Sequence, residues 1–223
     1  MNVTTVEDHT FVSSVLSRSG TVLDFGFNLG EFSRKVSKVY ECRCVGFEPN
    51  PSLIEAASQS GLEVHQYAIV AGQKEAKFHV NEDITSSSLI KGLDGETRAL
   101  SVPCLGWSDA FEQARCSEAV LVKMDIEGAE IDLLRSLTLE EAQKAHQICV
   151  EFHDVHGLYP SSVAKEAVRH VCSLNFAAVV WSRSCYYDVT FLNRKCFSRL
   201  EIFKLKYLHR LERLLRNRFS QNP

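Results

Sequence analysis

Apolar runs of strand length alternate along this chain with stretches of helical periodicity, and this order constrains the fold more than any other feature of the sequence. The runs are Thr21–Phe25, Cys44–Glu48, Val64–Val70, Ala119–Asp125, Ile148–His153, Ala177–Trp181 and Tyr186–Leu192. Strands that alternate with helices predict a mostly parallel sheet with helices on both faces. We therefore expect a doubly wound α/β fold with about seven strands.

The length and composition fit one globular domain followed by a basic tail. A chain of 223 residues, 45% apolar and 24% charged, is long enough for a substantial core and unlike a disordered or fibrous protein. We expect a domain over residues 1–193 and a basic amphipathic helix or tail over residues 194–223, which carries nine Lys or Arg against two Glu. The tail is thus +7, and because the whole chain is −3, the domain is −10 and repels nucleic acid.

The tail also has an apolar helical face, formed by Leu200, Phe203, Tyr207, Leu211, Leu214 and Leu215. This face is expected to dock on the protein's own acidic domain or on a second subunit of a homo-oligomer. Peripheral contact with an anionic membrane surface, or binding of nucleic acid, is the alternative.

The sequence contains no apolar run of about 18 residues and no signal-peptide pattern, so we expect a cytoplasmic protein. Its eight cysteines are scattered and have no paired C-x-x-C spacing. Reduced thiols are therefore expected rather than disulfides or a cysteine metal site.

A glycine-containing loop, Asp24-Phe-Gly-Phe-Asn-Leu-Gly30, connects the first predicted strand to a helix. Glycines at such a turn let the backbone approach a ligand, and free N–H groups face it. We expect the helix to run from Asn28, as its N-cap, to Val39. The glycines are four residues apart and do not fit the G-x-G-x-x-G pattern of dinucleotide sites.

Glu48 ends the next strand, 24 residues after Asp24, and Asn50-Pro51 then opens another helix. Doubly wound folds commonly place a carboxylate here to bind two ribose hydroxyls. The loop and the acid together predict an adenosine-containing ligand at the carboxyl edge of the sheet.

More polar side chains gather at the same edge. Asp125 and Glu127 follow a buried run and share a face if the backbone stays extended, whereas Glu130 is expected on the following helix, whose dipole favours an acid. Glu151 and His153 share a face of the next strand and are expected to meet Asp125.

Together these motifs resemble the FkbM family of class I, Rossmann-like methyltransferases. The glycine loop with Gly30-Glu-Phe, then Phe47-Glu-Pro-Asn-Pro51 and Lys123-Met-Asp-Ile-Glu-Gly-Ala-Glu130, carry the resemblance, which extends over about residues 20 to 155. It implies that S-adenosylmethionine is the cofactor, held by Asp24, Gly26, Asn28, Gly30, Glu48, Asp125 and Ser87 of the Ser86–Ser88 run. Of these, Asp24, Gly26, Asn28 and Gly30 would hold the methionine end, Glu48 the ribose and the serine the adenine region. Phe27 stands where the family usually has a small residue, and its ring would either crowd the cofactor or pack beneath it.

The resemblance favours O-methylation of a hydroxyl group on a sugar or another small molecule. Alignment of acceptor and methyl group supplies most of the acceleration in such a transfer. His153 is the expected general base, oriented by Asp125 or Glu151. Alternatively, Asp125 and Glu151 hold a divalent metal such as Mg²⁺ that lowers the pKa of the hydroxyl. The acceptor pocket is expected in residues 81–97 and 154–162.

Two other classes of function stay open at this point. A catalytically inactive Rossmann-like module would bind a partner through the basic helix, with its cofactor pocket either filled or closed by Phe27. A nicotinamide-dependent oxidoreductase would share the architecture, but should have the dinucleotide glycine spacing.

Overall fold

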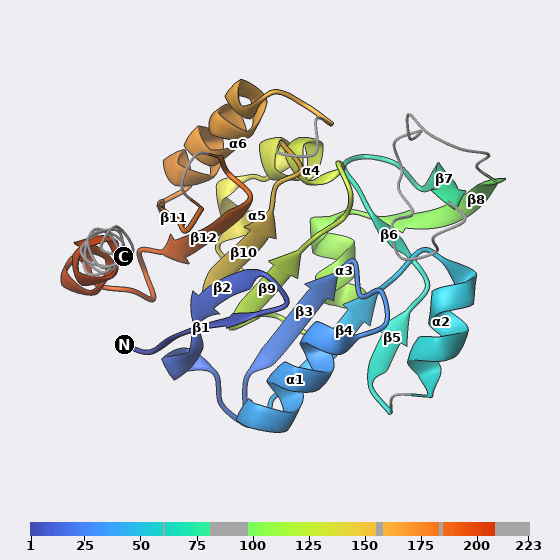
Figure 1. Cartoon of the computed structure of the whole chain (residues 1–223), viewed down its shortest axis with the longest axis horizontal. Helices are drawn as coiled ribbons and strands as arrows, with labels where there is room; N and C mark the ends of the chain where they lie inside the picture. The colour runs from blue at the N-terminus through green and yellow to red at the C-terminus, as the bar shows by residue number, and fades with distance from the viewer. Residues whose placement is uncertain (60, 81–97, 155–157, 183–184, 208–223) are drawn as a thin grey trace, which may run out of the picture.

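The main sheet of the protein has seven strands. The computed structural model describes residues 1–59, 61–80, 98–154, 158–182 and 185–207 (Figure 1). In spatial order the strands are β11 (Phe176–Val180), β12 (Asp188–Asn193), β10 (Gln147–Glu151), β9 (Leu121–Met124), β3 (Thr21–Phe25), β4 (Arg43–Phe47) and β5 (Glu63–His65). Adjacent strands from β10 to β5 are parallel, and β12 runs antiparallel between β10 and β11.

The order of the strands reverses between β3 and β9. From β3 the chain moves outward through β4 and β5, then returns to the other side of β3 and continues through β9 and β10. In an open parallel sheet, ligands bind at the carboxyl ends of the strands on either side of such a reversal. The predicted doubly wound, mostly parallel sheet of seven strands is confirmed.

The helices cover both faces of the sheet. On one face, α3 (Trp107–Gln113), α4 (Glu130–Ser136), α5 (Leu139–Ala142) and α6 (Ser161–Ser173) pack on a core that includes Leu23 and Phe25. On the other face, α1 (Glu31–Tyr40) packs on a smaller core that includes Val22. Because side chains of β3 alternate, Asp24 points to the α1 face, where it bonds Ser33.

A β-hairpin that the sequence did not predict crosses the α1 face of the sheet. It consists of β1 (Val3–Val6) and β2 (His9–Val12), followed by the short 3-10 helix η1 (Ser13–Val15), and Figure 1 shows it in front of β9 and β10. The backbone N–H and C=O of Val12 both bond the Gln147 amide, each at 2.9 Å. Thr10 donates through its hydroxyl to Asp188 at 2.5 Å. These bonds fix the hairpin, and with it His9, over the end of β10.

A second, three-stranded sheet is formed by strands that follow helix α2 (Pro51–Ser58) and β5 in the chain. Its order is β6 (Ala68–Ile69), β8 (Arg98–Leu105) and β7 (Glu75–Val80), and β7 pairs with β8 antiparallel. The strand expected over residues 64–70 is therefore wrong as one element. The chain turns at Tyr67, whose N–H bonds the His65 carbonyl, so that β5 and β6 belong to different sheets.

The described part of the tail is a helix over residues 199–207. It packs on the domain through Ile202 and Leu205, whereas Leu200, Phe203 and Tyr207 are 62%, 64% and 56% exposed. The predicted docking of this apolar face on the protein's own domain is thus wrong for these three residues, and a second subunit or a membrane as its partner stays a prediction. None of the described helices has the length and apolarity needed to span a bilayer.

Candidate active site

The glycine loop makes a tight turn between β3 and α1. Gly26 has φ +81°, and a Cβ atom there would lie 1.7 Å from the carbonyl oxygen of Asp125. Asn28 is also left-handed, with φ 52°, and its N–H donates to Glu48 Oε2 at 2.9 Å. The helix begins only at Glu31, with Gly30 as its N-cap. The expected start at Asn28 is therefore wrong, because Asn28 turns its N–H away from the helix toward Glu48.

The ring of Phe27 packs beneath this loop. It is 2% exposed, and Cβ atoms placed on Gly46 and Gly30 would lie 2.0 Å and 2.3 Å from it. The two glycines therefore leave the space that the ring fills. This position is compatible with the ring packing beneath a bound cofactor, which stays a prediction.

Phe27→Ala is expected to destabilise the protein by about 3–5 kcal/mol without improving cofactor binding, since it leaves a cavity under the loop. Denaturant unfolding and calorimetric titration with S-adenosylmethionine would measure the two effects. Phe203→Ala, at an exposed position, is the control and should change stability little. A clear gain in affinity on replacing Phe27 would show instead that the ring crowds the cofactor.

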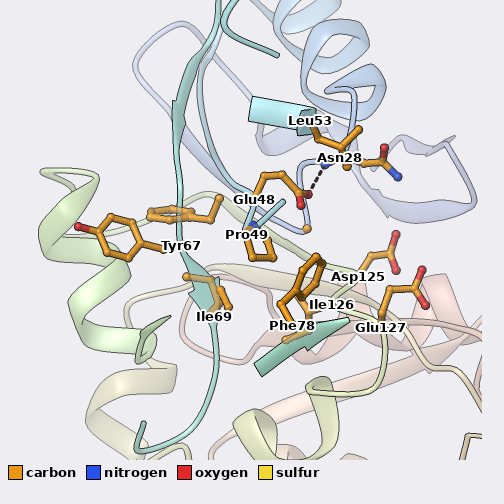
Figure 2. A pocket seen from close by; sticks show the side chains of 13 residues that line it. Asn28, Glu48, Pro49, Leu53, Tyr67, Ile69, Phe78, Asp125, Ile126 and Glu127 are labelled. Atoms are coloured by element: carbon orange, nitrogen blue, oxygen red, sulfur yellow. Dashed lines mark hydrogen bonds between the residues drawn. The ribbon is translucent and has the colours of Figure 1, made fainter. Parts of the chain in front are cut away.

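A cavity of about 530 Å³, including solvent at its mouth, lies between the loop and the three-stranded sheet. Figure 2 shows Glu48 and Asn28 on one side, and Tyr67, Ile69 and Phe78 on another. The remaining residues that line it are Gly26, Phe47, Pro49, Leu53, Ala68, Asp125, Ile126 and Glu127. We call this space the first cavity.

Glu48 is held firmly at the edge of the first cavity. It is 5% exposed, and its Oε1 and Oε2 accept bonds from the backbone N–H groups of Asn50, at 2.8 Å, and Asn28. Burial raises the pKa of Glu48, while these two hydrogen bonds oppose the shift. Asn50 is the predicted cap of α2, whose side chain accepts from Ser52.

Beneath the loop lies a buried ion pair between Lys123 and Asp24. Lys123 Nζ is 3.2 Å from Asp24 Oδ1, 3.6 Å from Asp125 Oδ2 and donates to the Gly26 carbonyl at 2.6 Å. Burial by itself would lower the pKa of Lys123, but the two carboxylates outweigh it and raise the pKa. Asp24 is 0% exposed, so in this conformation it shapes the loop and does not touch the solvent of a cavity.

His153 lies among four carboxylates. Its Nδ1 is 3.1 Å from Glu130, and its Nε2 is 3.2 Å from Glu127, 3.6 Å from Asp125 and 4.0 Å from Glu151. Burial opposes protonation, but the bond to Glu130 and the surrounding charges raise the pKa of His153 to about 9. The ring is therefore an imidazolium at neutral pH, and its role as a base stays a prediction that requires loss of that proton.

Glu130 anchors this cluster. It is the first residue of α4, as expected, but it is 0% exposed and not merely a partner of the helix dipole. Its carboxylate accepts from the hydroxyl of Tyr159 at 2.5 Å and from the Gly128 N–H at 2.7 Å. These bonds hold Glu130 against His153 and so position the imidazole.

A second cavity, of about 770 Å³ including open solvent, lies on the other side of the loop under the hairpin. It is lined by Glu7, Asp8, His9, Gly26, Phe27, Asn28, Leu29, Glu31, Phe32, Lys123, Asp125, Glu151 and Tyr187. Gly26, Asn28 and Asp125 line both cavities. The two spaces therefore border the same three residues, where β3 and β9 end.

The predicted site residues come together only in part. Gly26, Asn28, Glu48 and Asp125 line the first cavity, and Asp125 also lies near Glu151 and His153 as expected. Gly30 and Asp24 do not belong to the lining of the first cavity. Gly30 lies against the Phe27 ring, and Asp24 is buried beneath the loop, where it accepts a hydrogen bond from Ser33. Ser87 and its neighbours lie outside the described residues, as do residues 81–97 and 155–157 of the expected acceptor pocket.

Lys123 and His9 are among the residues of the site that sequence reasoning missed. Lys123 is a charged residue inside an otherwise apolar run, which is a signal for a buried ion pair. His9 follows a Glu7-Asp8 turn between two short runs rich in β-branched residues, which is a hairpin pattern.

Residues 24–176 match the model of the family described as the methyltransferase FkbM domain, which is more than half of the chain. The chain belongs to the FkbM methyltransferase family. The predicted resemblance is thereby confirmed, and the matched region extends past the predicted end near residue 155 to the start of β11.

One similar protein is Methyltransferase 1 of Beauveria bassiana (strain ARSEF 2860), which is 26% identical over 163 residues. The match covers 61% of this chain and 66% of that relative's length. Two similar solved structures are a TehB-like SAM-dependent methyltransferase from Corynebacterium glutamicum ATCC 13032 Kitasato and a precorrin-6y C5,15-methyltransferase from Geobacter metallireducens GS-15. The first is 11% identical with a TM-score of 0.45, covering 81% of this chain and 83% of its own. The second is 9% identical with a TM-score of 0.46, covering 81% and 85%.

Proposed function

We propose that this protein transfers the methyl group of S-adenosylmethionine to a hydroxyl group of a sugar or another small molecule. The observation that carries the proposal is that two cavities share Gly26, Asn28 and Asp125 as lining residues, at the carboxyl edge of the sheet. One cavity suits the cofactor and the other the acceptor, so the two reactants would face each other across these residues. Holding reactants in line supplies much of the acceleration in such a displacement.

The first cavity fits S-adenosylmethionine by its chemistry. The Glu48 carboxylate lies at the end of β4, next to the loop, where it can accept hydrogen bonds from ribose hydroxyls. Tyr67, Ile69 and Phe78 offer an apolar surface for the adenine ring. Bound there, the cofactor would supply an activated methyl group on a positively charged sulfur.

The second cavity suits a neutral acceptor with several hydroxyl groups. The carboxylates of Glu7, Asp8, Asp125 and Glu151 line it and accept hydrogen bonds from hydroxyls. The same charges repel phosphate groups, which disfavours nucleic acid and phosphorylated acceptors. We therefore place the acceptor in this cavity, and the acceptor pocket expected in residues 81–97 and 154–162 stays a prediction.

Transfer to a hydroxyl also requires removal of its proton. His153, held at Nδ1 by Glu130 and not by Asp125 or Glu151, is the base in this proposal, and it would first have to release its own proton to the surrounding carboxylates. Burial raises the pKa of Glu127 to about 7, which places one such carboxylate near neutrality. The neighbouring groups can therefore share a proton with the imidazole.

Separate observations weaken the two alternative functions, the inactive binding module and the oxidoreductase. The packing of Phe27 beneath the loop supports an open cofactor pocket over the inactive module with a closed one. The glycine spacing and the family membership both argue against a nicotinamide-dependent oxidoreductase.

Calorimetric titration of the full chain with S-adenosylmethionine, S-adenosylhomocysteine and NAD tests the cofactor. Binding of the first two and not of NAD is expected. An acceptor screen with isotopically labelled S-adenosylmethionine and free sugars, glycosides and phenols, read by mass spectrometry, then tests the reaction. Labelled product only with amine or thiol acceptors would contradict O-methylation.

Glu48→Gln is expected to weaken binding of S-adenosylmethionine by about tenfold or more. The amide has one acceptor oxygen in place of the carboxylate that now bonds two backbone N–H groups, and charged hydrogen bonds are worth about 1.5–3 kcal/mol. Glu63→Gln is the matched control, because Glu63 forms an exposed pair with Arg43. Equal affinities for the two variants would remove Glu48 from the cofactor site.

A further inference from the structure

His9 is a buried imidazole with one nitrogen left for a ligand. The ring is 2% exposed and packs against Phe32, with ring centroids 5.6 Å apart. Its Nδ1 bonds the backbone carbonyl of Glu7. Because a carbonyl only accepts, Nδ1 carries the proton, and Nε2 of the neutral ring has a free lone pair.

Nε2 of His9 points toward the acidic end of the second cavity. Among the described residues it has no hydrogen-bond partner, and the carboxylate oxygen Oε2 of Glu151 is 3.9 Å away. That distance is too long for a hydrogen bond, yet a lone pair buried without a partner is costly. An additional group between His9 and the carboxylates would satisfy it.

His9, Asp125 and Glu151 have the spacing of a metal site. One ligand atom from each lies within 4.8 Å of the others, although the three residues come from β2, the end of β9 and the end of β10. The bond from Nδ1–H to a backbone carbonyl is also the support that metal-binding histidines usually have. The spacing of the three ligand atoms and the Nδ1–H hydrogen bond both depend on the folded chain, and no single sequence motif contains them.

An excess of carboxylates at this place favours the binding of a cation. Around Asp125 the structure gathers the carboxylates of Asp24, Asp125, Glu127, Glu130 and Glu151. In these pairs five carboxylates face two basic groups, Lys123 and His153. A divalent ion would offset this excess of carboxylates.

We propose that His9, Asp125 and Glu151 bind a divalent metal ion of the first transition row. Two carboxylates alone, as the sequence indicated, would suit Mg²⁺, but the imidazole shifts the preference toward ions such as Mn²⁺. The ion would lie at the wall of the second cavity with open positions for water or hydroxyl oxygens. Binding of the ion is independent of the proposed reaction; only its use in activating an acceptor hydroxyl rests on that proposal.

A second trio, Asp125, Glu127 and His153, has similar spacing. Both ring nitrogens of His153 already face carboxylates at 3.1 and 3.2 Å, so a metal there would displace an existing bond. His9 gives up no such bond through Nε2. The two trios share Asp125, and variants of the two histidines therefore separate them.

Titration of the full-length protein with Mn²⁺, followed by electron paramagnetic resonance, tests the site. One ion per chain is expected, with a coupling to an imidazole nitrogen in the spin-echo spectrum. His9→Gln should abolish the coupling, and both His9→Gln and Glu151→Gln should weaken binding by about tenfold or more. His146→Gln, which changes a histidine paired with Glu118 elsewhere, should leave affinity unchanged.

Absence of Mn²⁺ binding at millimolar concentration would overturn the proposal, and so would full affinity and nitrogen coupling in His9→Gln. Loss of binding in His153→Gln alone would assign the metal to the other trio. Thermal unfolding identifies a misfolded variant, and Glu151→Gln tests the site without disturbing the hairpin. S-adenosylmethionine titrated into the metal-free protein tests the methyl-transfer proposal separately.

Discussion

Lys123→Met is expected to lower the free energy of unfolding by about 3–5 kcal/mol, the usual cost of removing one partner from a buried ion pair. Methionine nearly matches the length of lysine, so the change removes the charge and leaves most of the volume. Asp24, which is 0% exposed, would keep only the Ser33 hydroxyl, and the Gly26 carbonyl would lose its donor. Chemical denaturation with two spectroscopic probes measures the loss.

Lys35→Met is the control for this experiment. Lys35 also pairs with a carboxylate, Glu7, but both side chains are about half exposed, and such pairs contribute about 0–1 kcal/mol. Adding Asp24→Asn to Lys123→Met should recover part of the stability, because it removes the buried charge left alone. Equal losses for the two lysine variants would show that the buried pair does not stabilise the loop.

The fold could be predicted because its strands and turns are marked by local sequence patterns. Each central strand is a mostly apolar run, as parallel strands buried on both faces require, and glycine, asparagine or proline marks the turns after β3 and β4. The gathering of Glu48, Asp125 and Glu151 was also predictable, since parallel strands bring their carboxyl ends to one edge.

The parts that were missed depend on contacts between distant residues. His9 reaches the site because Thr10 bonds Asp188 and Val12 bonds Gln147, and no local pattern specifies those pairs. The start of α1 was misplaced because Asn28 is drawn to Glu48, twenty residues away in sequence. In both cases a tertiary hydrogen bond overrides the local preference of the chain.

Different charged residues also hold different parts of the site in place. Lys123 and Asp24 lie beneath the loop and fix its backbone, whereas Glu48 lies at the cofactor side and Asp125 borders both cavities. His153 is held by Glu130 from the α4 side, and His9 approaches from the hairpin. The loop between β3 and α1 therefore borders both cavities and rests on the buried pair beneath it.

Gly26→Ala should have the largest effect on cofactor binding. At φ +81° an alanine costs about 1–2 kcal/mol in backbone strain, and its Cβ, 1.7 Å from the Asp125 carbonyl oxygen, would force the loop and β9 apart. Overpacking of this kind adds about 1–3 kcal/mol, so a total loss of stability near 3 kcal/mol is expected. The displaced loop should bind S-adenosylmethionine at least about tenfold more weakly, and methyl transfer should fall by about 10²-fold, as for a 1 Å misplacement.

Gly72→Ala is the matched control for Gly26→Ala, because Gly72 has φ +66° but no atom within 4 Å of the added Cβ. It carries the backbone strain without the collision, so it should cost only about 1–2 kcal/mol and leave the cofactor affinity unchanged. The difference between the two variants in unfolding free energy and in calorimetric affinity then measures the close approach of the loop to β9. If the two alanines had the same effect on affinity, contact between Gly26 and the Asp125 backbone would have no part in forming the cofactor site.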